Sequence, residues 1–254
     1  MDEHRVMQGL PDTAPVVVAH RGDATHFPEN TISALRGAVA CGVQHLEFDV
    51  QLTADRVPVL LHDESLLRTA GIDQIITASI AAELSRVGVG QADRFGDSFH
   101  REYLPSLSDA LAALSGQSLT LFVELKRHSL RAFGRRRMLD AVLPILHGGQ
   151  HNFVIVSFDW RVLQYVRECS DFPIGFVLDA HDARAITQIV QLSPQYVFCN
   201  ERRLPPADVP LWWGNWDWVI YEITRADQAR QLARRGATYV ESMEACRLER
   251  ELRP

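Results

Sequence analysis

Long hydrophobic runs are missing from this sequence. The longest apolar stretches, such as Val16–Ala19 and Leu119–Val123, are only long enough for a strand, whereas a membrane-spanning helix needs ~18–20 apolar residues. The N-terminal residues Met1–Arg5 are charged, and no apolar signal core follows them. We therefore expect a protein that has no transmembrane segment, is not exported and works in the cytoplasm.

Cysteine is scarce, and the four cysteines are widely separated. Cys41, Cys169, Cys199 and Cys246 form no Cys-x-x-Cys pair, which argues against a zinc knuckle or a dithiol redox motif. Four cysteines can form two disulfides, but disulfides are rare in proteins that stay in the cytosol. Because no export signal is evident, the sequence favours free thiols.

The chain is also poor in basic charge and lacks a nucleotide-binding glycine motif. It has 26 Lys and Arg against 32 Asp and Glu, for a net charge of −6. Domains that bind nucleic acid usually carry a basic surface, so we do not expect nucleic acid as the main partner. No Gly-x-Gly-x-x-Gly motif follows the first apolar strand, so dinucleotide binding has no support.

What the sequence does contain is a regular alternation of strand-like and helix-like segments. Several of the strand-like runs are apolar on both faces, as strands buried in a parallel sheet are. The runs are Val16–Ala19, His45–Val50, Val57–Leu61, Leu119–Leu125, Phe153–Ser157, Ile174–Leu178, Tyr196–Cys199, Trp218–Ile223 and Tyr239–Ser242. If Val57–Leu61 is a hairpin-like extension of the run before it, eight βα units remain.

Eight βα units in 254 residues predict an α/β fold, a (β/α)8 TIM barrel. A doubly wound sheet is the alternative, but it uses fewer strands.

No interdomain linker or repeat interrupts the chain, so we expect one domain over residues 1–254. Residues 63–104 are polar and poor in helix-like patterns, and we predict that they form a small insertion after the second strand, over one mouth of the barrel. The oligomeric state, including a homo-oligomer, stays open.

Ionisable side chains lie at the ends of consecutive predicted strands, where TIM barrels carry their catalytic groups. In chain order, these residues are His20, Arg21, Glu47, Asp49, His62, Glu124 and Lys126. Side chains alternate along a strand, so Glu47 and Asp49 project to one side, and so do Glu124 and Lys126. We therefore expect the set to converge on one mouth of the barrel.

Such a set has a definite chemical meaning. Three carboxylates brought together repel one another, and a hard divalent cation such as Mg²⁺ or Ca²⁺, which prefers oxygen ligands, removes that conflict. Two histidines supply a candidate base and a candidate acid. Arg21 and Lys126 supply positive charge for an anionic substrate. The combination suits the hydrolysis of a phosphate ester.

An ordered series of short motifs resembles the glycerophosphodiester phosphodiesterase family. The resemblance extends from about residue 16 to residue 243. The motifs are His20-Arg21-Gly22, Pro28-Glu29-Asn30-Thr31, Glu47-x-Asp49-Val50, Thr53-x-Asp55, Pro58-Val59, His62-Asp63, Leu67-Arg68-Thr69, Leu104-Pro105-Ser106-Leu107, Glu124-x-Lys126 and Ser157-Phe158-Asp159.

The resemblance implies a TIM barrel with one divalent metal, Mg²⁺ or Ca²⁺, that hydrolyses glycerophosphodiesters to glycerol 3-phosphate and an alcohol. By position, Glu47, Asp49 and Glu124 match the family's metal ligands. His20 and His62 match its acid/base pair, and we favour His20 as the base and His62 as the acid. Arg21 and Lys126 match the phosphate contacts. Asn30 and Glu29 match residues that order the loop beside the site.

The match weakens towards the C-terminus. Where the family often has Trp-Thr-Val-Asn, this chain has Tyr221-Glu222-Ile223-Thr224, and where it often has Thr-Asp, this chain has Ser242-Met243 after Glu241. We expect Tyr221 to replace the aromatic wall of the substrate site and to bind the substrate. Because of strand alternation, Glu222 is expected on the opposite side, in a structural role.

Two other functions fit the same residues. A lysophospholipase D would act on lipids that still carry one acyl chain, and would need an apolar channel near the tryptophans at 212, 213, 216 and 218. A non-catalytic barrel could hold a phosphorylated ligand, but the intact set of histidines and carboxylates argues against it. The preferred prediction is a glycerophosphodiester phosphodiesterase whose partner is its small-molecule substrate.

Overall fold

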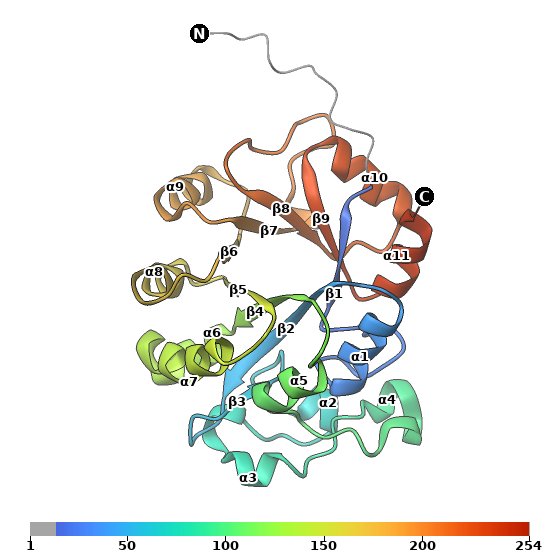
Figure 1. The fold of residues 1–254 in the computed structure, drawn as a ribbon, viewed down its shortest axis with the longest axis vertical. Coiled ribbons are helices and arrows are strands. Elements are labelled where there is room, and N and C mark those ends of the chain that lie inside the picture. Colours follow the sequence, from blue (N-terminus) through green and yellow to red (C-terminus); the bar gives the residue numbers. More distant parts are fainter. Residues whose placement is uncertain (1–13, 254) are drawn as a thin grey trace.

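A computed structural model describes residues 14–253, so the expectation about the extreme N-terminus lies outside the described residues. The described residues form a nine-stranded sheet in which β1 pairs with both β2 and β9, and this pairing closes the sheet into a barrel (Figure 1). The strands are β1 (Val16–His20), β2 (His45–Leu52), β3 (Pro58–Leu60), β4 (Thr120–Leu125), β5 (Asn152–Ser157), β6 (Ile174–Val177), β7 (Tyr196–Asn200), β8 (Asp217–Tyr221) and β9 (Ala237–Ser242). The predicted TIM barrel is confirmed.

The short strand β3 is not part of the barrel wall. It pairs with β2 in antiparallel fashion, with Val50 opposite Leu60, whereas the other neighbouring strands are parallel. This arrangement is the hairpin-like extension expected from the sequence. Eight parallel strands remain in the wall, and their carboxyl ends face the same mouth.

The segment between β3 and α5 (Leu107–Ala113) contains only short helices. They are α2 (Leu67–Ala70), η1 (Ile76–Ala78), α3 (Ala81–Leu84), α4 (Ala92–Phe95) and η2 (Gly96–Phe99). These helices enclose a small apolar cluster of their own, which includes Leu66, Ile76, Leu84 and Leu104. The segment therefore holds itself together beside the barrel, at the lower edge of Figure 1.

Helices pack around the outside of the barrel (Figure 1). Besides α5, they are α1 (Ile32–Ala40), α6 (Arg127–Phe133), α7 (Arg135–His147), α8 (Trp160–Cys169), α9 (Ala183–Leu192), α10 (Ala226–Arg234) and α11 (Ala245–Leu252). The α1 helix begins at Thr31, whose hydroxyl accepts a hydrogen bond from the backbone of Ala34. This cap satisfies one of the free amide groups at the helix start.

One of the eight expected βα units has no α-helix. After β7 the chain forms only the short η3 (Glu201–Arg203) and then an irregular stretch up to β8, all of it within the described residues. This stretch contains Pro205, Pro206 and Pro210. Proline has no amide hydrogen and clashes with the preceding turn, so it blocks a helix here.

The alternation of side chains divides the core into two parts. Outward-facing residues such as Phe48, Val123 and Leu125 pack against the helices in the large cluster. Inward-facing residues such as Phe122 and Phe198 fill the barrel below its mouth. Apolar filling of the interior leaves only the carboxyl ends of the strands for polar groups.

The expectation of free thiols is wrong for two cysteines. Cys41 and Cys246 form a disulfide, with Cα atoms 5.6 Å apart and a sequence separation of 205 residues, whereas Cys169 and Cys199 are free. Cys41 ends α1 and Cys246 lies in the first turn of α11. Closure of the barrel between β1 and β9 brings these distant helices together, and cysteine spacing alone does not reveal this.

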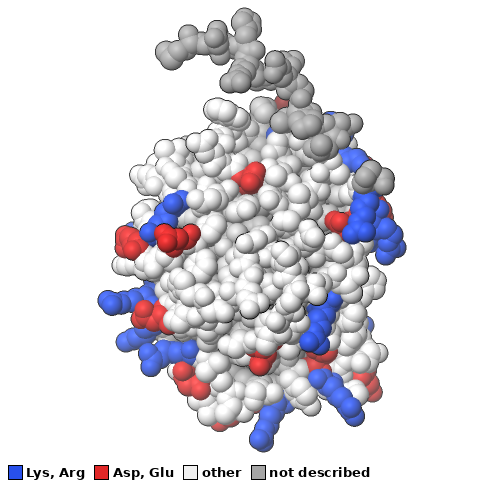
Figure 2. All heavy atoms as spheres, viewed as in Figure 1, with Lys and Arg blue, Asp and Glu red and all other residues white. Residues whose placement is uncertain are grey.

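Charged side chains of both signs are interspersed on the face shown in Figure 2, mostly towards its margins. The middle of this face is largely uncharged. None of the helices between residues 14 and 253 is long and apolar enough to cross a membrane.

Candidate active site

A cavity of about 290 Å³ opens at the carboxyl ends of the barrel strands. One side of its lining is polar and comes from β1, β2, β4 and β9 and from the chain that follows β3. The other side is largely apolar and comes from β5 to β8. The lining residues are His20, Arg21, Glu47, His62, Glu124, Lys126, Val156, Phe158, Val177, Phe198, Tyr221, Glu222 and Glu241.

Strand register explains why the predicted carboxylates meet. His20 at the end of β1 lies beside Glu47 of β2, and Asp49 of β2 lies beside Glu124 of β4. One oxygen from each of Glu47, Asp49 and Glu124 lies within 4.8 Å of the others. The structure therefore brings together the three residues that the sequence proposed as metal ligands, in a geometry that one ion can span.

Asp49 lies at the centre of a buried network. Its carboxylate contacts Lys126 Nζ at 3.0 Å and Arg21 Nε at 3.0 Å. Asn30 donates a hydrogen bond to Asp49 Oδ2 and accepts one from the Asp49 amide. Burial alone would raise the pKa of Asp49, but Lys126 and Arg21 outweigh burial and hold this pKa far below its usual range. Asp49 is therefore ionised.

The other two carboxylates of the trio are in a different electrostatic state. Burial and the charges of Asp49 and Glu241 raise the pKa of Glu47 well above its usual value. Burial also raises the pKa of Glu124, although Lys126, 2.8 Å away, opposes the shift. In addition, Glu47 Oε1 is buried and has no hydrogen-bond partner among the described residues. The protein therefore provides too little positive charge and too few hydrogen-bond donors to balance Glu47 and Glu124 when both are ionised.

A second network joins the site to the insertion. Glu29 accepts a hydrogen bond from Arg21 Nη1 at 2.8 Å and two from Arg68, at 2.6 and 2.8 Å. Burial opposes ionisation of Glu29, but the hydrogen bonds from Arg68 and the charge of Arg21 lower its pKa to about 2. Arg68 also contacts Asp63 at 2.6 Å. Arg68, which was not predicted as a site residue, therefore fixes Glu29, the partner of Arg21. It also binds Asp63 in the loop that carries His62.

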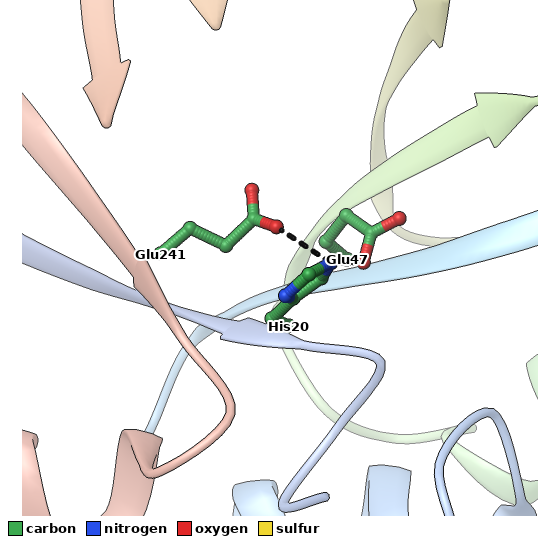
Figure 3. A group of neighbouring side chains, drawn as sticks. All are labelled: His20, Glu47 and Glu241. Atoms are coloured by element: carbon green, nitrogen blue, oxygen red, sulfur yellow. Dashed lines mark ion pairs between the residues drawn. The ribbon is translucent and has the colours of Figure 1, made fainter. Parts of the chain in front are cut away.

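The two predicted histidines line the same cavity but differ in exposure. The His62 side chain is 36% exposed, and its Nδ1 lies 2.7 Å from Asp63 Oδ1. His20 is buried, and its Nε2 lies 3.3 Å from Glu241 Oε1 and 3.9 Å from Glu47 Oε2 (Figure 3). Burial and the nearby Arg21 lower the pKa of His20 well below its usual value. Each imidazole thus has a carboxylate close to a ring nitrogen.

A model of the glycerophosphoryl diester phosphodiesterase family matches residues 20–205. This match covers more than half of the chain. The chain belongs to the glycerophosphoryl diester phosphodiesterase family. The resemblance that the sequence motifs indicated is confirmed.

Individual relatives and solved structures agree with this membership. Glycerophosphodiester phosphodiesterase 1 of Bos taurus is 30% identical over 165 residues, which are 65% of this chain and 49% of the relative. Glycerophosphodiester phosphodiesterase of Caldanaerobacter subterraneus is 33% identical over 154 residues, which are 60% of this chain and 62% of the relative. The chain thus spans about half to three-fifths of the length of these curated relatives.

The fold agrees with a solved structure over nearly its full length. The phosphodiesterase of Oleispira antarctica, solved in complex with the product sn-glycerol-3-phosphate, has a TM-score of 0.82 and 23% identity. The similarity covers 93% of this chain and 96% of that chain.

This family member departs from the family's frequent pattern at the end of β8. Tyr221 lines the cavity as predicted, but the expectation that Glu222 faces the opposite side is wrong, because Glu222 also lines the cavity. The strand ends at Tyr221, and Glu222 has a φ of 68°, in the left-handed region. This turn cancels the strand alternation and places Glu222 Oε1 4.0 Å from His20 Nδ1.

Glu241 was missed as a site residue, although a signal for it exists in the sequence. It lies near the end of the last strand and on the inward face, opposite Val18 of β1. The rule that identified Glu124 at the end of β4 would also have selected Glu241. The family motif at this strand corresponds to Ser242 and Met243 and does not include Glu241.

The tryptophans do not form part of the cavity lining among the described residues. Trp218 is buried against the outer core, and Trp212 stacks on His181 with ring centroids 3.5 Å apart. Trp213 is 95% exposed, in the loop that leads into the amino end of β8. Trp212 and Trp218 therefore pack against other side chains outside the cavity.

Proposed function

We propose that this protein hydrolyses glycerophosphodiesters to glycerol 3-phosphate and an alcohol, with a divalent metal ion. The observation that carries the proposal is the joint lining of one cavity by Glu47, Glu124, the two histidines, Arg21 and Lys126, in a member of this family. The curated relatives named above carry this activity in their names. The related Oleispira antarctica phosphodiesterase was solved with sn-glycerol-3-phosphate.

Glu47, Asp49 and Glu124 would hold the metal. Their oxygens lie within 4.8 Å of one another, the unpartnered Glu47 Oε1 is available as a ligand, and an all-oxygen set suits Mg²⁺ or Ca²⁺. Burial raises the pKa values of Glu47 and Glu124, and the nearby cations do not offset this effect. When bound, the ion supplies Lewis-acid polarisation of the phosphoryl oxygens.

Arg21 and Lys126 would bind the phosphate. Both side chains reach the cavity, and both stay cationic, because Asp49 and the nearby glutamates raise the pKa of each although burial opposes this. Their neighbours fix them in place: Arg21 by Glu29 and Asp49, and Lys126 by Asp49 and Glu124. Pre-positioned cations stabilise the charge that develops on the transferred phosphoryl group.

His20 would act as the base and His62 as the acid. His62 Nδ1 lies beside Asp63, so Nε2 is the nitrogen directed to substrate, from which a general acid would deliver its proton. The more exposed His62 suits the leaving-group side, and the buried His20 suits the attacking oxygen deeper in the cavity.

The size and lining of the cavity favour a deacylated substrate over a lysophospholipid. Its volume of about 290 Å³ is at the small end for ligand pockets. Val177, Phe198 and Tyr221 give the cavity an apolar wall. A lysophospholipase D would need the tryptophans along an acyl channel. Among the described residues, no tryptophan lines this cavity.

The deciding experiment is an assay of released glycerol 3-phosphate. The metal-free protein receives Mg²⁺ or Ca²⁺, and each form is offered several glycerophosphodiesters and one lysophospholipid. We expect metal-dependent release from the glycerophosphodiesters, and none after Glu124→Gln. Preferential cleavage of the lysophospholipid would favour the lysophospholipase D, and tight binding of the diesters without turnover would favour a non-catalytic barrel.

A further inference from the structure

We propose that Glu241 is a positioning residue for His20: its carboxylate orients the imidazole ring and stabilises the positive charge that the ring gains on accepting a proton. The inference rests on the proposed function, in which His20 is the base. It assigns a role to a residue that lies directly before the positions at which this chain differs from the family's frequent pattern.

The burial of Glu241 requires an explanation. Its side chain is 4% exposed, and its ion-pair partner is His20, with Glu241 Oε1 3.3 Å from Nε2. A carboxylate removed from water is unfavourable unless a donor or cation compensates it. The neighbouring Glu47 makes the environment of Glu241 still less favourable for a negative charge. Glu241 therefore stays in this position at a cost to the fold.

The fold places this carboxylate where it can act on His20. β1 and β9 are neighbours in the barrel wall, with Val18 opposite Glu241 and Ala19 opposite Ser242. Val18 and His20 are two residues apart on one strand, so they share the inward face with Glu241. Figure 3 shows Glu241 extending from β9 towards the His20 ring, with Glu47 of β2 close to the same nitrogen.

The surroundings of the ring distinguish its two nitrogens. Nε2 faces the carboxylates of Glu241 and Glu47, which favour a proton on that atom. Nδ1 is buried and has no hydrogen-bond partner among the described residues, and Glu222 Oε1 lies 4.0 Å from it, farther than Glu241 Oε1 lies from Nε2. The lone pair that accepts a proton is therefore on Nδ1, and the ring cannot exchange the two roles while Glu241 holds Nε2–H.

The proton balance of the step follows from this assignment. As the attacking oxygen forms its bond to phosphorus, its proton moves to Nδ1 of His20. The bond between phosphorus and the leaving oxygen breaks, and that oxygen takes a proton from His62. His20 becomes a cation next to the Glu241 anion, in the manner of other catalytic imidazoles that a carboxylate orients. His62 and Asp63 form the corresponding pair on the leaving side.

The same three side chains suggest a competing role for Glu241. His20, Glu47 and Glu241 offer ligand atoms within 4.8 Å of one another, so Glu241 could instead be a ligand of a second cation. That role predicts a different result when metal is counted, and the experiment below includes this measurement.

A double-mutant cycle tests whether Glu241 acts through His20. We expect Glu241→Gln to lower kcat on a glycerophosphodiester by about 100-fold, with little change in KM, because loss of a working base costs roughly 10²–10⁴. In a His20→Ala background, the same change should lower kcat no further. An equal loss in both backgrounds would overturn the proposal, because a purely structural role does not depend on His20. Glu168→Gln, on the exposed side of α8, controls for the glutamate-to-glutamine change.

Two measurements that need no turnover complete the test. Titration with Mn²⁺ should give the same number of bound ions in the wild type and in Glu241→Gln, and loss of an ion would make Glu241 a ligand and refute the positioning role. NMR of ¹⁵N-labelled histidine should show His20 protonated on Nε2 in the wild type and a mixture of tautomers in Glu241→Gln. A wild-type ring protonated on Nδ1 would refute the proposal, whereas a wild type inactive on every diester would refute the proposed function alone.

Discussion

At the scale of single residues, the site is governed by the balance of buried charge. The largely buried carboxylates of Glu47, Asp49, Glu124 and Glu241 face the two permanent cations Arg21 and Lys126. When every group is ionised, two negative charges remain in excess. Both cations contact Asp49, whose pKa falls, whereas Glu124 contacts only Lys126 of the two and the pKa values of the three glutamates rise. A divalent cation would restore the balance where it is poorest.

The role of His62 leads to a prediction about leaving groups. A glycerophosphodiester releases an alkoxide, which needs a proton, whereas p-nitrophenolate needs one far less. We expect His62→Ala to lose at least about 100-fold in kcat on a glycerophosphodiester, but less than about 10-fold on a p-nitrophenyl phosphodiester. His20→Ala should lose comparably on both substrates. Equal losses for His62→Ala would contradict its assignment as the acid, and the reverse pattern would exchange the two roles.

The low pKa of Glu29 predicts a pH dependence of stability. The folded-state pKa of about 2 lies below the ordinary value of 4.5, so ionised Glu29 stabilises the fold above about pH 4.5, and this contribution is lost as the pH falls towards 2. Between pH 6 and pH 3 the loss is about 2 kcal/mol. Urea unfolding of wild type and Glu29→Gln should therefore show a difference in free energy of unfolding that shrinks by this amount. A difference that stays constant with pH would contradict the ion-pair explanation.

At the scale of elements, strand register and strand ends position the site. Register puts His20 beside Glu47 and Asp49 beside Glu124. The left-handed turn at Glu222 directs one more carboxylate into the cavity after β8 has ended. Such a conformation is unfavourable for a residue with a side chain, and residues of this kind cluster at functional sites.

The start of α5 gives a prediction about stability. Ser106 and Asp109 form a capping box, in which each side chain accepts a hydrogen bond from the other residue's backbone amide. We expect Ser106→Ala to lower the free energy of unfolding by about 1 kcal/mol. Ser108→Ala, an exposed serine in the same helix, should change it little. Equal effects of the two substitutions in urea titrations would show that the cap is not the stabilising feature.

At the scale of the whole molecule, the contact between β1 and β9 completes the barrel. This contact joins the first strand to the last, and it brings His20 next to Glu241. On the outside of the barrel, the disulfide between Cys41 and Cys246 connects α1 with α11 near the same seam. A covalent bond therefore connects the helices beside the seam between β1 and β9, which forms part of the polar side of the cavity.

The disulfide predicts a large effect of reduction on stability. It closes a loop of about 205 residues, and restriction of the unfolded chain by such a loop stabilises the folded state by roughly 3–5 kcal/mol. We expect Cys246→Ser to lower the free energy of unfolding by this amount under oxidising conditions and to make it insensitive to reductant. Cys169→Ser, which removes a free and exposed thiol, should behave like the wild type. A wild type unaffected by reductant would contradict the stabilising role.

The order of apolar runs and the charged residues at their ends determined much of this protein. Strand periodicity predicted the barrel, and the phase of Glu47, Asp49, Glu124 and Lys126 predicted their convergence, because both depend on local alternation along strands. The hairpin and the cap at Thr31 are local features as well. Proline at positions 205, 206 and 210 carried a local signal too, against a helix after β7.

Other features were decided only by the tertiary structure. The pairing of Cys41 with Cys246 and of His20 with Glu241 depends on which strand closes the barrel, and residues more than 200 positions apart carry no local sign of it. The direction of Glu222 depends on where β8 stops and on a backbone angle that alternation does not predict. The pKa values depend on burial, which exists only once the chain has folded around the site.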